Sequence, residues 1–180
     1  MPTHHVPQPS PDRMVPVAGH PFVLALEPDQ PELVALTAAM WAAAAGASTL
    51  YCAYVDQGRY VAEEYADGTV LHVPIDPDGM DDRWQERQQT YERHLTEVLG
   101  DAGVPWVFRY LAGRPDRALT HLARAVDAAA FVVGTQAPGP GSRMREFLDG
   151  SLAVRLSHHQ HRPVLIVPLE VIDWRASHWT

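Results

Sequence analysis

Apolar residues along the chain follow two alternating patterns, one typical of buried strands and the other of helices. A short continuous apolar run, such as FVLAL at residues 22–26, indicates a parallel strand buried on both faces. Apolar residues repeated every three or four positions indicate a helix, as in the alanine-rich run from Glu32 to Ala45. Pro31 precedes this run and Gly46 ends it, as expected at helix boundaries.

The same alternation continues to residue 168. Further strands are predicted over residues 49–55, 104–111, 129–135 and 163–168. Further helices are predicted after the Asp81-Asp82 pair, after Gly113-Arg114-Pro115-Asp116, and from Gly150-Ser151. The residues predicted to face the sheet are Trp84, Tyr91, Leu95, Val98 and Leu99 in the first of these helices and Leu119, Leu122 and Val126 in the second. Strands that alternate with helices predict an α/β fold with a parallel sheet covered on both faces.

One segment, residues 58–76, departs from this alternation. Two runs with a period of two, at residues 60–65 and 69–75, flank the Asp67-Gly68 pair. This pair favours a two-residue type I′ turn, which requires positive φ angles. We therefore predict an inserted β-hairpin.

The two ends of the chain lack the pattern of the domain. Residues 1–20 contain five prolines and no apolar period, which predicts a flexible leader. The domain is expected over residues 21–168, followed by a C-terminal tail at 169–180 that contains Trp174 and Trp179.

Charge and composition exclude several classes of function. The formal net charge is −8, and all 14 basic residues are arginine, so no broad basic face for nucleic acid and no lysine for a phosphate loop of the GxxxxGK[ST] type is expected. Cys52 is the only cysteine, which rules out an internal disulfide. No apolar run is long enough to span a bilayer, so we expect a cytoplasmic protein without membrane contact.

A glycine-rich loop, GTQAPGPGSRMREFLDGS at residues 134–151, is the main candidate for ligand binding. Gly134, Gly139 and Gly141 let the backbone adopt left-handed conformations and approach a ligand closely. Gly150-Ser151 opens a helix whose free N–H groups attract an anion. The alternative is that the loop only connects a strand to a helix, because such loops commonly contain glycine and proline.

Three stretches resemble the universal stress protein family over about residues 21–168: GRPDRALTHLARAVDAAAFVVGT, the GS pair and HRPVLIVP. The resemblance implies a doubly wound sheet of five parallel strands, of the adenine-nucleotide alpha-hydrolase-like type. The resemblance also points to ATP binding, which one branch of the family performs through the motif G-x-x-G-(nine residues)-G-[ST]. Gly134 matches the first glycine and Gly150-Ser151 the end of this motif, but the second glycine falls on Ala137 or Pro140, and the loop is three residues longer.

The resemblance also implies where a nucleotide contacts the chain. Gly139 or Gly141 can replace the missing glycine, and Arg143 can supply positive charge. Glu27 takes the place of the family's acidic residue after the first strand, and Tyr54 that of the residue packed against adenine. The expected nucleotide-binding residues are therefore Glu27, Tyr54, Gly134, Thr135, Gly139, Gly141, Arg143, Gly150, Ser151 and Leu152, with ATP, with or without magnesium, as the ligand.

Three functional hypotheses remain open at this point. The first is a non-catalytic stress-response module in which an adenine nucleotide shifts the population of two states. The second is a homodimer that has lost nucleotide binding and acts through protein partners, and the third is a slow ATP hydrolase. By resemblance, a dimer is expected to form through the last strand, at Val164, Leu165, Ile166 and Val167.

Other chemistry-bearing residues have structural interpretations. His158, His159 and His161 are close enough in sequence to suggest a metal site, but histidines at a helix end also favour the helix dipole. The Asp76–Gly79 segment resembles a calcium loop, yet Arg87 stands where the twelfth-position glutamate belongs. Cys52 is expected to be buried and inert.

Overall fold

The sheet and its helices follow the order predicted from the apolar pattern. The structure, a computed structural model, describes residues 10–76, 83–135 and 151–169. The main sheet is formed by β1 (Phe22–Leu26), β2 (Leu50–Asp56), β5 (Trp106–Ala112), β6 (Ala130–Gly134) and β7 (Val164–Val167). The helices in the described ranges are η1 (Pro11–Arg13), a short 3-10 helix, and α1 (Glu32–Ala44), α2 (Trp84–Leu99), α3 (Pro115–Ala125) and α5 (Leu152–His159).

All five strands of this sheet are parallel, in the order β5-β2-β1-β6-β7. From β1 the chain winds through β2 to β5, and then crosses to β6 on the other side of β1 and ends at β7. The doubly wound sheet implied by the resemblance is confirmed. Its strand order reverses between β1 and β6, and ligands of open parallel sheets bind beyond the strand ends at such a point.

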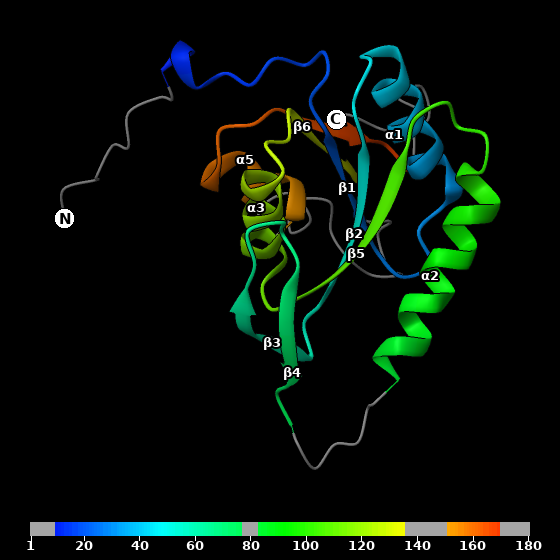
Figure 1. The fold of residues 1–180 in the computed structure, drawn as a ribbon, viewed down its shortest axis with the longest axis vertical. Helices are drawn as coiled ribbons and strands as arrows, with labels where there is room; N and C mark the ends of the chain where they lie inside the picture. Colours follow the sequence, from blue (N-terminus) through cyan, green and yellow to red (C-terminus); the bar gives the residue numbers. More distant parts are fainter. Residues whose placement is uncertain (1–9, 77–82, 136–150, 170–180) are drawn as a thin grey trace, which may run out of the picture.

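Helices cover both faces of the sheet, with α1 and α2 on one side and α3 and α5 on the other (Figure 1). Successive side chains of a strand point to opposite faces. Leu24 and Cys52 therefore pack beneath α1 and α2, whereas Val23 and Ala53 pack beneath α3 and α5. This double burial explains why residues 22–26 form a continuous apolar run.

The apolar stripes predicted for two helices face the sheet. In α2 the residues that pack there are Trp84, Tyr91, Leu95, Val98 and Leu99. In α3 they include Leu119 and Leu122, followed by Val126 directly after the helix. The Asp81-Asp82 pair predicted to cap α2 lies outside the described residues; the helix follows Arg83, whose side chain makes no capping hydrogen bond. Of the helices in the described part of the chain, none has the length and apolar character needed to cross a membrane.

The inserted hairpin is present, but its turn differs from the prediction. β3 (Arg59–Glu64) and β4 (Val70–Pro74) pair antiparallel. Gly68 N–H donates to the Tyr65 carbonyl at 3.0 Å, and Tyr65 N–H donates to the Thr69 carbonyl at 2.9 Å, so residues 66–68 form a three-residue loop. Only Gly68 in this loop has a positive φ, of 82°. The type I′ turn is therefore wrong: Asp67 instead uses its carboxylate to accept bonds from the N–H and hydroxyl of Thr69, at 3.0 and 2.6 Å.

The hairpin covers one edge of the main sheet. It contacts edge strand β5, and its tip rests on α3, where Glu64 pairs with His121 at 3.2 Å. At the other edge, β7 has no further strand beside it in the described ranges, and Ile166 is 49% exposed. The two edges therefore differ, since the insertion blocks further strand pairing at β5 only.

Part of the segment predicted to be a leader contacts the domain. Val15 packs against the buried cluster beneath α1 and α2. Gly19 N–H donates to the Gly46 carbonyl, which follows α1, at 3.1 Å. These contacts lie at the amino ends of the strands, away from the crevice where the strand order reverses.

We expect Gly68→Ala to lower the free energy of unfolding more than Gly46→Ala. Both glycines have positive φ, 82° and 63°, so alanine is strained at each by about 1 to 2 kcal/mol. At Gly46 no atom lies within 4 Å of an added β-carbon, whereas at Gly68 this carbon would stand 2.6 Å from Cδ1 of the buried Leu122. Urea denaturation measures both losses, and equal losses would contradict a tip pressed against α3.

Candidate functional site

The carboxyl ends of β1 and β6 bring several predicted site residues together. Glu27 follows β1 directly, and Gly134 is the last residue of β6, its neighbour in the sheet. Thr135 comes next, and its N–H donates to the carbonyl of Val167 at the end of β7, at 2.9 Å. These residues therefore line the crevice at which the strand order reverses.

Gly134 is needed for space rather than for an unusual backbone conformation. It is not among the described glycines with positive φ. A β-carbon at this position would lie 3.0 Å from Nε2 of Gln30, 3.2 Å from Cγ2 of Val34 and 3.3 Å from Cδ1 of Leu169. The bare backbone thus lets the β1–α1 loop, helix α1 and the segment after β7 converge on the end of β6.

The first turn of α5 presents hydrogen-bond donors at the same crevice. Ser151 is the N-cap of the helix, and its hydroxyl accepts a hydrogen bond from Val154 N–H at 3.3 Å. One turn into the helix, the buried Nε–H of Arg155 has no hydrogen-bond partner among the described residues. A helix N-terminus carries a partial positive charge and the guanidinium adds a full one, so the pair is suited to an anion.

One buried carboxylate balances part of this positive charge. Asp116, 3% exposed in the first turn of α3, accepts a hydrogen bond from Arg114 at 2.8 Å. Burial by itself raises the pKa of Asp116, but the hydrogen bonds and charge of Arg114, with a smaller effect from Arg155, outweigh it and lower the pKa. Asp116 is therefore ionised at neutral pH, and Arg155 lies within its field without a hydrogen bond to it.

A hollow of about 530 Å³ lies between the sheet and the start of α5. We call it the α5 hollow; its lining includes Ala25, Glu27, Ala53, Gly58, Leu152 and Arg155. Ala25 and Ala53 are cross-strand partners on β1 and β2, and their small side chains leave room above the sheet. The volume falls within the range of small-molecule sites, roughly 300 to 1,000 Å³.

A larger hollow, of about 930 Å³, lies on the other face of the sheet between α1 and α2. We call it the α1–α2 hollow; its lining includes Glu27, Tyr54, Arg87, Tyr91, His94 and Leu95. Leu26, Glu27, Pro28 and Tyr54 line both hollows. The segment that follows β1 therefore forms part of the wall between them.

Tyr54, expected to pack against a bound base, turns its ring toward α2. The ring stacks on Tyr91 with 4.7 Å between centroids and meets Tyr110 edge-on at 5.4 Å. Burial, together with the charge of Asp56, raises the pKa of the Tyr54 hydroxyl. The ring thus belongs to the α1–α2 face, whereas Leu152 and Arg155 lie on the α5 face.

The structure describes only part of the predicted site. Gly139, Gly141, Arg143 and Gly150 lie outside the described residues. Sequence reasoning missed Arg155. Its position four residues after Ser151 was the available signal, because residues four apart share one face of a helix.

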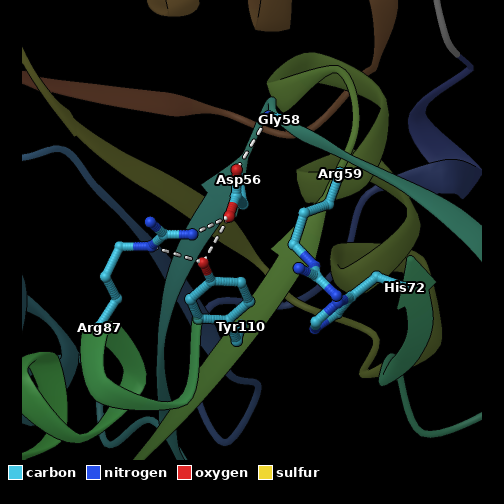
Figure 2. Close-up of polar contacts among 6 residues, drawn as sticks. All are labelled: Asp56, Gly58, Arg59, His72, Arg87 and Tyr110. Atoms are coloured by element: carbon cyan, nitrogen blue, oxygen red, sulfur yellow. Dashed lines mark hydrogen bonds and ion pairs between the residues drawn. The ribbon is translucent and has the colours of Figure 1, made fainter. Parts of the chain in front are cut away.

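A buried carboxylate organises the polar contacts beside the α5 hollow (Figure 2). Asp56, at the end of β2, is 7% exposed. One of its oxygens accepts hydrogen bonds from the guanidinium of Arg87 at 2.9 Å and the hydroxyl of Tyr110 at 2.6 Å, and the other accepts from Gly58 N–H at 2.9 Å. Arg87 Nε–H also donates to the Tyr110 hydroxyl, at 3.1 Å. A buried charge is tolerated when it is paired and fully hydrogen-bonded in this way.

The hairpin is attached next to this cluster by a buried arginine and a histidine. Arg59 of β3 is 6% exposed, and its Nε–H donates to Nδ1 of His72 on β4 at 2.7 Å. The His72 ring meets Trp84 edge-on at 4.7 Å and lies 5.3 Å from the ring of Tyr110. The guanidinium of Arg59 lies 5.7 Å from the centre of the Trp84 ring, within cation–π range.

The remaining chemistry-bearing residues lie apart from the crevice. Cys52 is fully buried, and burial raises the pKa of its thiol to about 12, so no thiolate forms at neutral pH. His158 and His159 are exposed at the end of α5, and His161 is exposed just beyond it. Arg87, considered above as the residue that breaks a calcium loop, is the ion-pair partner of Asp56.

Comparison with known proteins gives one consistent result. The model of the Universal stress protein family matches residues 20–168. A protein of this family from Burkholderia pseudomallei is 25% identical, with a TM-score of 0.56, over 83% of this chain and 96% of that one. A universal stress protein in complex with cAMP is 22% identical, with a TM-score of 0.59, over 84% and 98%. The universal stress protein from Archaeoglobus fulgidus in complex with dAMP is 20% identical, with a TM-score of 0.54, over 82% and 96%. No curated protein matches the chain.

We expect Asp56→Ala to lower the free energy of unfolding by about 3 to 5 kcal/mol, because it removes one partner of a buried ion pair and leaves Arg87 uncompensated. Urea denaturation measures the loss. Glu64→Ala is the matched control: its carboxylate is 57% exposed in the pair with His121, so the loss should stay below about 1 kcal/mol. Comparably small losses in both variants would contradict the role given to Asp56.

We expect His72 to make the protein less stable as the pH falls below about 6.5. Burial, and then the charge of Arg59, lower the pKa of His72 from 6.5. The unfolded chain therefore binds the proton at a higher pH than the folded chain, so stability is lost as the pH falls through this interval. Protonation also removes the acceptor for Arg59.

Thermal unfolding at pH 7.5 and 5.5 checks this expectation. His72→Gln should show a smaller decrease in Tm between the two pH values than the unchanged protein. His94→Gln, at an exposed position of α2, is the control and should keep the full decrease. An identical decrease in His72→Gln and the unchanged protein would contradict the assignment.

Proposed function

Since this chain belongs to the universal stress protein family, we propose that it binds an adenine nucleotide, with ATP as the first candidate, in the α5 hollow. The observation that carries the proposal is the buried, unpartnered Nε–H of Arg155 beside the N-terminus of α5. Two similar solved structures hold cAMP and dAMP, each of which has one phosphate and one adenine. The role proposed is that of a binding and signalling module in the stress response.

Different residues of the chain contact the phosphates and the adenosine part of such a ligand. Ser151, Leu152 and Arg155 supply the N–H groups and positive charge for the phosphates. The loop residues expected to assist them are Gly139, Gly141, Arg143 and Gly150. Magnesium bound with ATP would reduce the charge that these groups must balance.

We assign the ribose and adenine of the nucleotide to the carboxyl ends of β1 and β6. Glu27 supplies a carboxylate for ribose or adenine hydroxyl and amino groups, and Gly134 and Thr135 form the neighbouring strand end. Tyr54 contributes through its place on the wall between the two hollows rather than through a ring aimed into the α5 hollow.

The larger α1–α2 hollow is a poorer place for phosphate. Four carboxylates line it, from Glu27, Asp29, Glu32 and Glu86. Two arginines, Arg83 and Arg87, also line it, and the charge of Arg87 is paired with Asp56, so the carboxylates outnumber the cations. Like charges repel a phosphate, so the volume of this hollow does not outweigh its chemistry.

Nucleotide binding in the α5 hollow can influence the hairpin. Residues 53–58 line this hollow. Asp56, within this stretch, is hydrogen-bonded to α2, to β5 and to Gly58, the residue directly before β3. A nucleotide that binds one arrangement of this segment better than another shifts the population toward it. This coupling is the mechanism we propose for signalling, in place of catalysis.

A homodimer in the cytoplasm is the form in which we propose that the module works. Val164, Leu165, Ile166 and Val167 form the edge strand β7, and Ile166 is half-exposed there. An open strand edge offers unpaired N–H and carbonyl groups to a second copy. The opposite edge is occupied by the hairpin, which leaves β7 for pairing.

Calorimetric titration of the purified chain with Mg-ATP, AMP and cAMP tests the proposed function. We expect micromolar binding of at least one nucleotide. Arg155→Gln should weaken it tenfold or more, because a hydrogen bond to a charged group contributes about 1.5 to 3 kcal/mol. Arg93→Gln, at an exposed position of α2, is the control and should leave the affinity unchanged.

Each other outcome overturns one part of the proposal. Equal affinity for Arg155→Gln and the unchanged protein would place the ligand elsewhere. Folded protein that binds none of the three nucleotides would favour a module that acts through protein partners. Release of ADP in the calorimeter samples would identify a hydrolase, and a monomeric mass by light scattering would remove the dimer through β7.

A further inference from the structure

Helix α1 has an apolar outer face. Leu33 is 54% exposed, Leu36 47%, Met40 61% and Trp41 50%. Their spacing of i, i+3, i+7 and i+8 places them along one side of the helix, which we call the α1 stripe. The buried residues of α1 form the opposite side and are Val34, Ala35, Ala38, Ala39 and Ala42.

This outer face is unlike that of the helix beside it. The exposed residues of α2, which covers the same face of the sheet, are all polar, and they include Gln85, Gln89, Arg93 and Glu97. A helix that is apolar on every side is typically buried. Large exposed apolar patches are rare on soluble monomeric proteins, and where they occur they commonly mark interaction surfaces.

The described chain ends close to α1. The N–H of Leu169, its last described residue, donates to the hydroxyl of Thr135 at 2.8 Å. Leu169 also packs against the buried cluster on the α1 side of the sheet. Its Cδ1 and Cγ2 of Val34 both lie within 3.3 Å of the point that a Gly134 β-carbon would occupy. The last described residue, Leu169, therefore lies beside the first turn of α1.

The sequence of residues 170–180 matches the α1 stripe. EVIDWRASHWT contains Val171, Ile172, Trp174 and Trp179. Extended, it spans at most about 40 Å, whereas the 13 residues of α1 are about 20 Å long. The segment is thus long enough to follow the whole stripe.

We propose that residues 170–180 dock on the α1 stripe of their own chain. Val171, Ile172 and Trp174 are the side chains that cover Leu33, Leu36 and Met40, since both sets are apolar and burying them together removes both from water. A covalently attached segment has an effective concentration in the millimolar range, so it outcompetes a second copy or a separate protein at ordinary concentrations. The proposal is independent of nucleotide binding.

The reactivity of a thiol introduced by Met40→Cys tests the docking. The native Cys52 does not interfere, because it is fully buried. We expect alkylation by iodoacetamide to be at least tenfold slower in the full chain than in a chain that ends after Leu169. A thiol introduced by Glu97→Cys, on the exposed side of α2, is the control and should react at the same rate in both chains.

A full-length variant tests the same proposal without truncation, and so remains informative if the truncated chain does not fold. Ile172→Asp together with Trp174→Asp should accelerate alkylation at position 40 to the same extent, with circular dichroism confirming an intact fold. Equal rates at position 40 in all three chains would overturn the proposal. So would protection that survives truncation and weakens on dilution, because that result would assign the stripe to a second copy.

Discussion

The carboxylate of Asp56 is almost entirely buried, and three separate parts of the chain form hydrogen bonds with it. Arg87 comes from α2, Tyr110 from the edge strand β5, and the N–H of Gly58 from the turn into the hairpin. Burying a carboxylate costs several kcal/mol unless its charge and lone pairs are satisfied. This requirement ties α2, β5 and the hairpin to the end of β2, and the same stretch of β2 lines the α5 hollow.

The functional proposal depends on side-chain chemistry within the crevice more than on the fold. A doubly wound sheet offers a crevice wherever its strand order reverses, whatever the ligand. Here the crevice is divided at the end of β1 into two hollows that differ in charge. Four carboxylates line the larger one, whereas two line the smaller one, where the buried Nε–H of Arg155 has no hydrogen-bond partner among the described residues. The chemistry therefore favours an anion in the smaller hollow.

The features that distinguish this chain from a plain five-stranded α/β domain lie at its surfaces. The hairpin occupies the β5 edge and leaves β7 open for a second copy. Helix α1, with its apolar outer side, lies on the opposite face of the sheet from α5 (Figure 1), and the described chain ends near the first turn of α1. The surfaces proposed for ligand, partner and tail are therefore separate from one another.

The sequence by itself determined the α/β class, the inserted hairpin, the inward faces of α2 and α3, the burial of Cys52 and the start of the last helix at Ser151. All of these depend on neighbouring residues, because hydrophobic periodicity and capping are local properties of the chain. Only the tertiary structure decided that Asp67 caps a three-residue turn, that the Tyr54 ring faces α2, and that the Nε–H of Arg155 has no hydrogen-bond partner among the described residues. It also decided that Asp56 binds residues 31 and 54 positions away in sequence. Such partners are set by how whole elements pack, and periodicity shows which side of an element is buried but not which residue it meets.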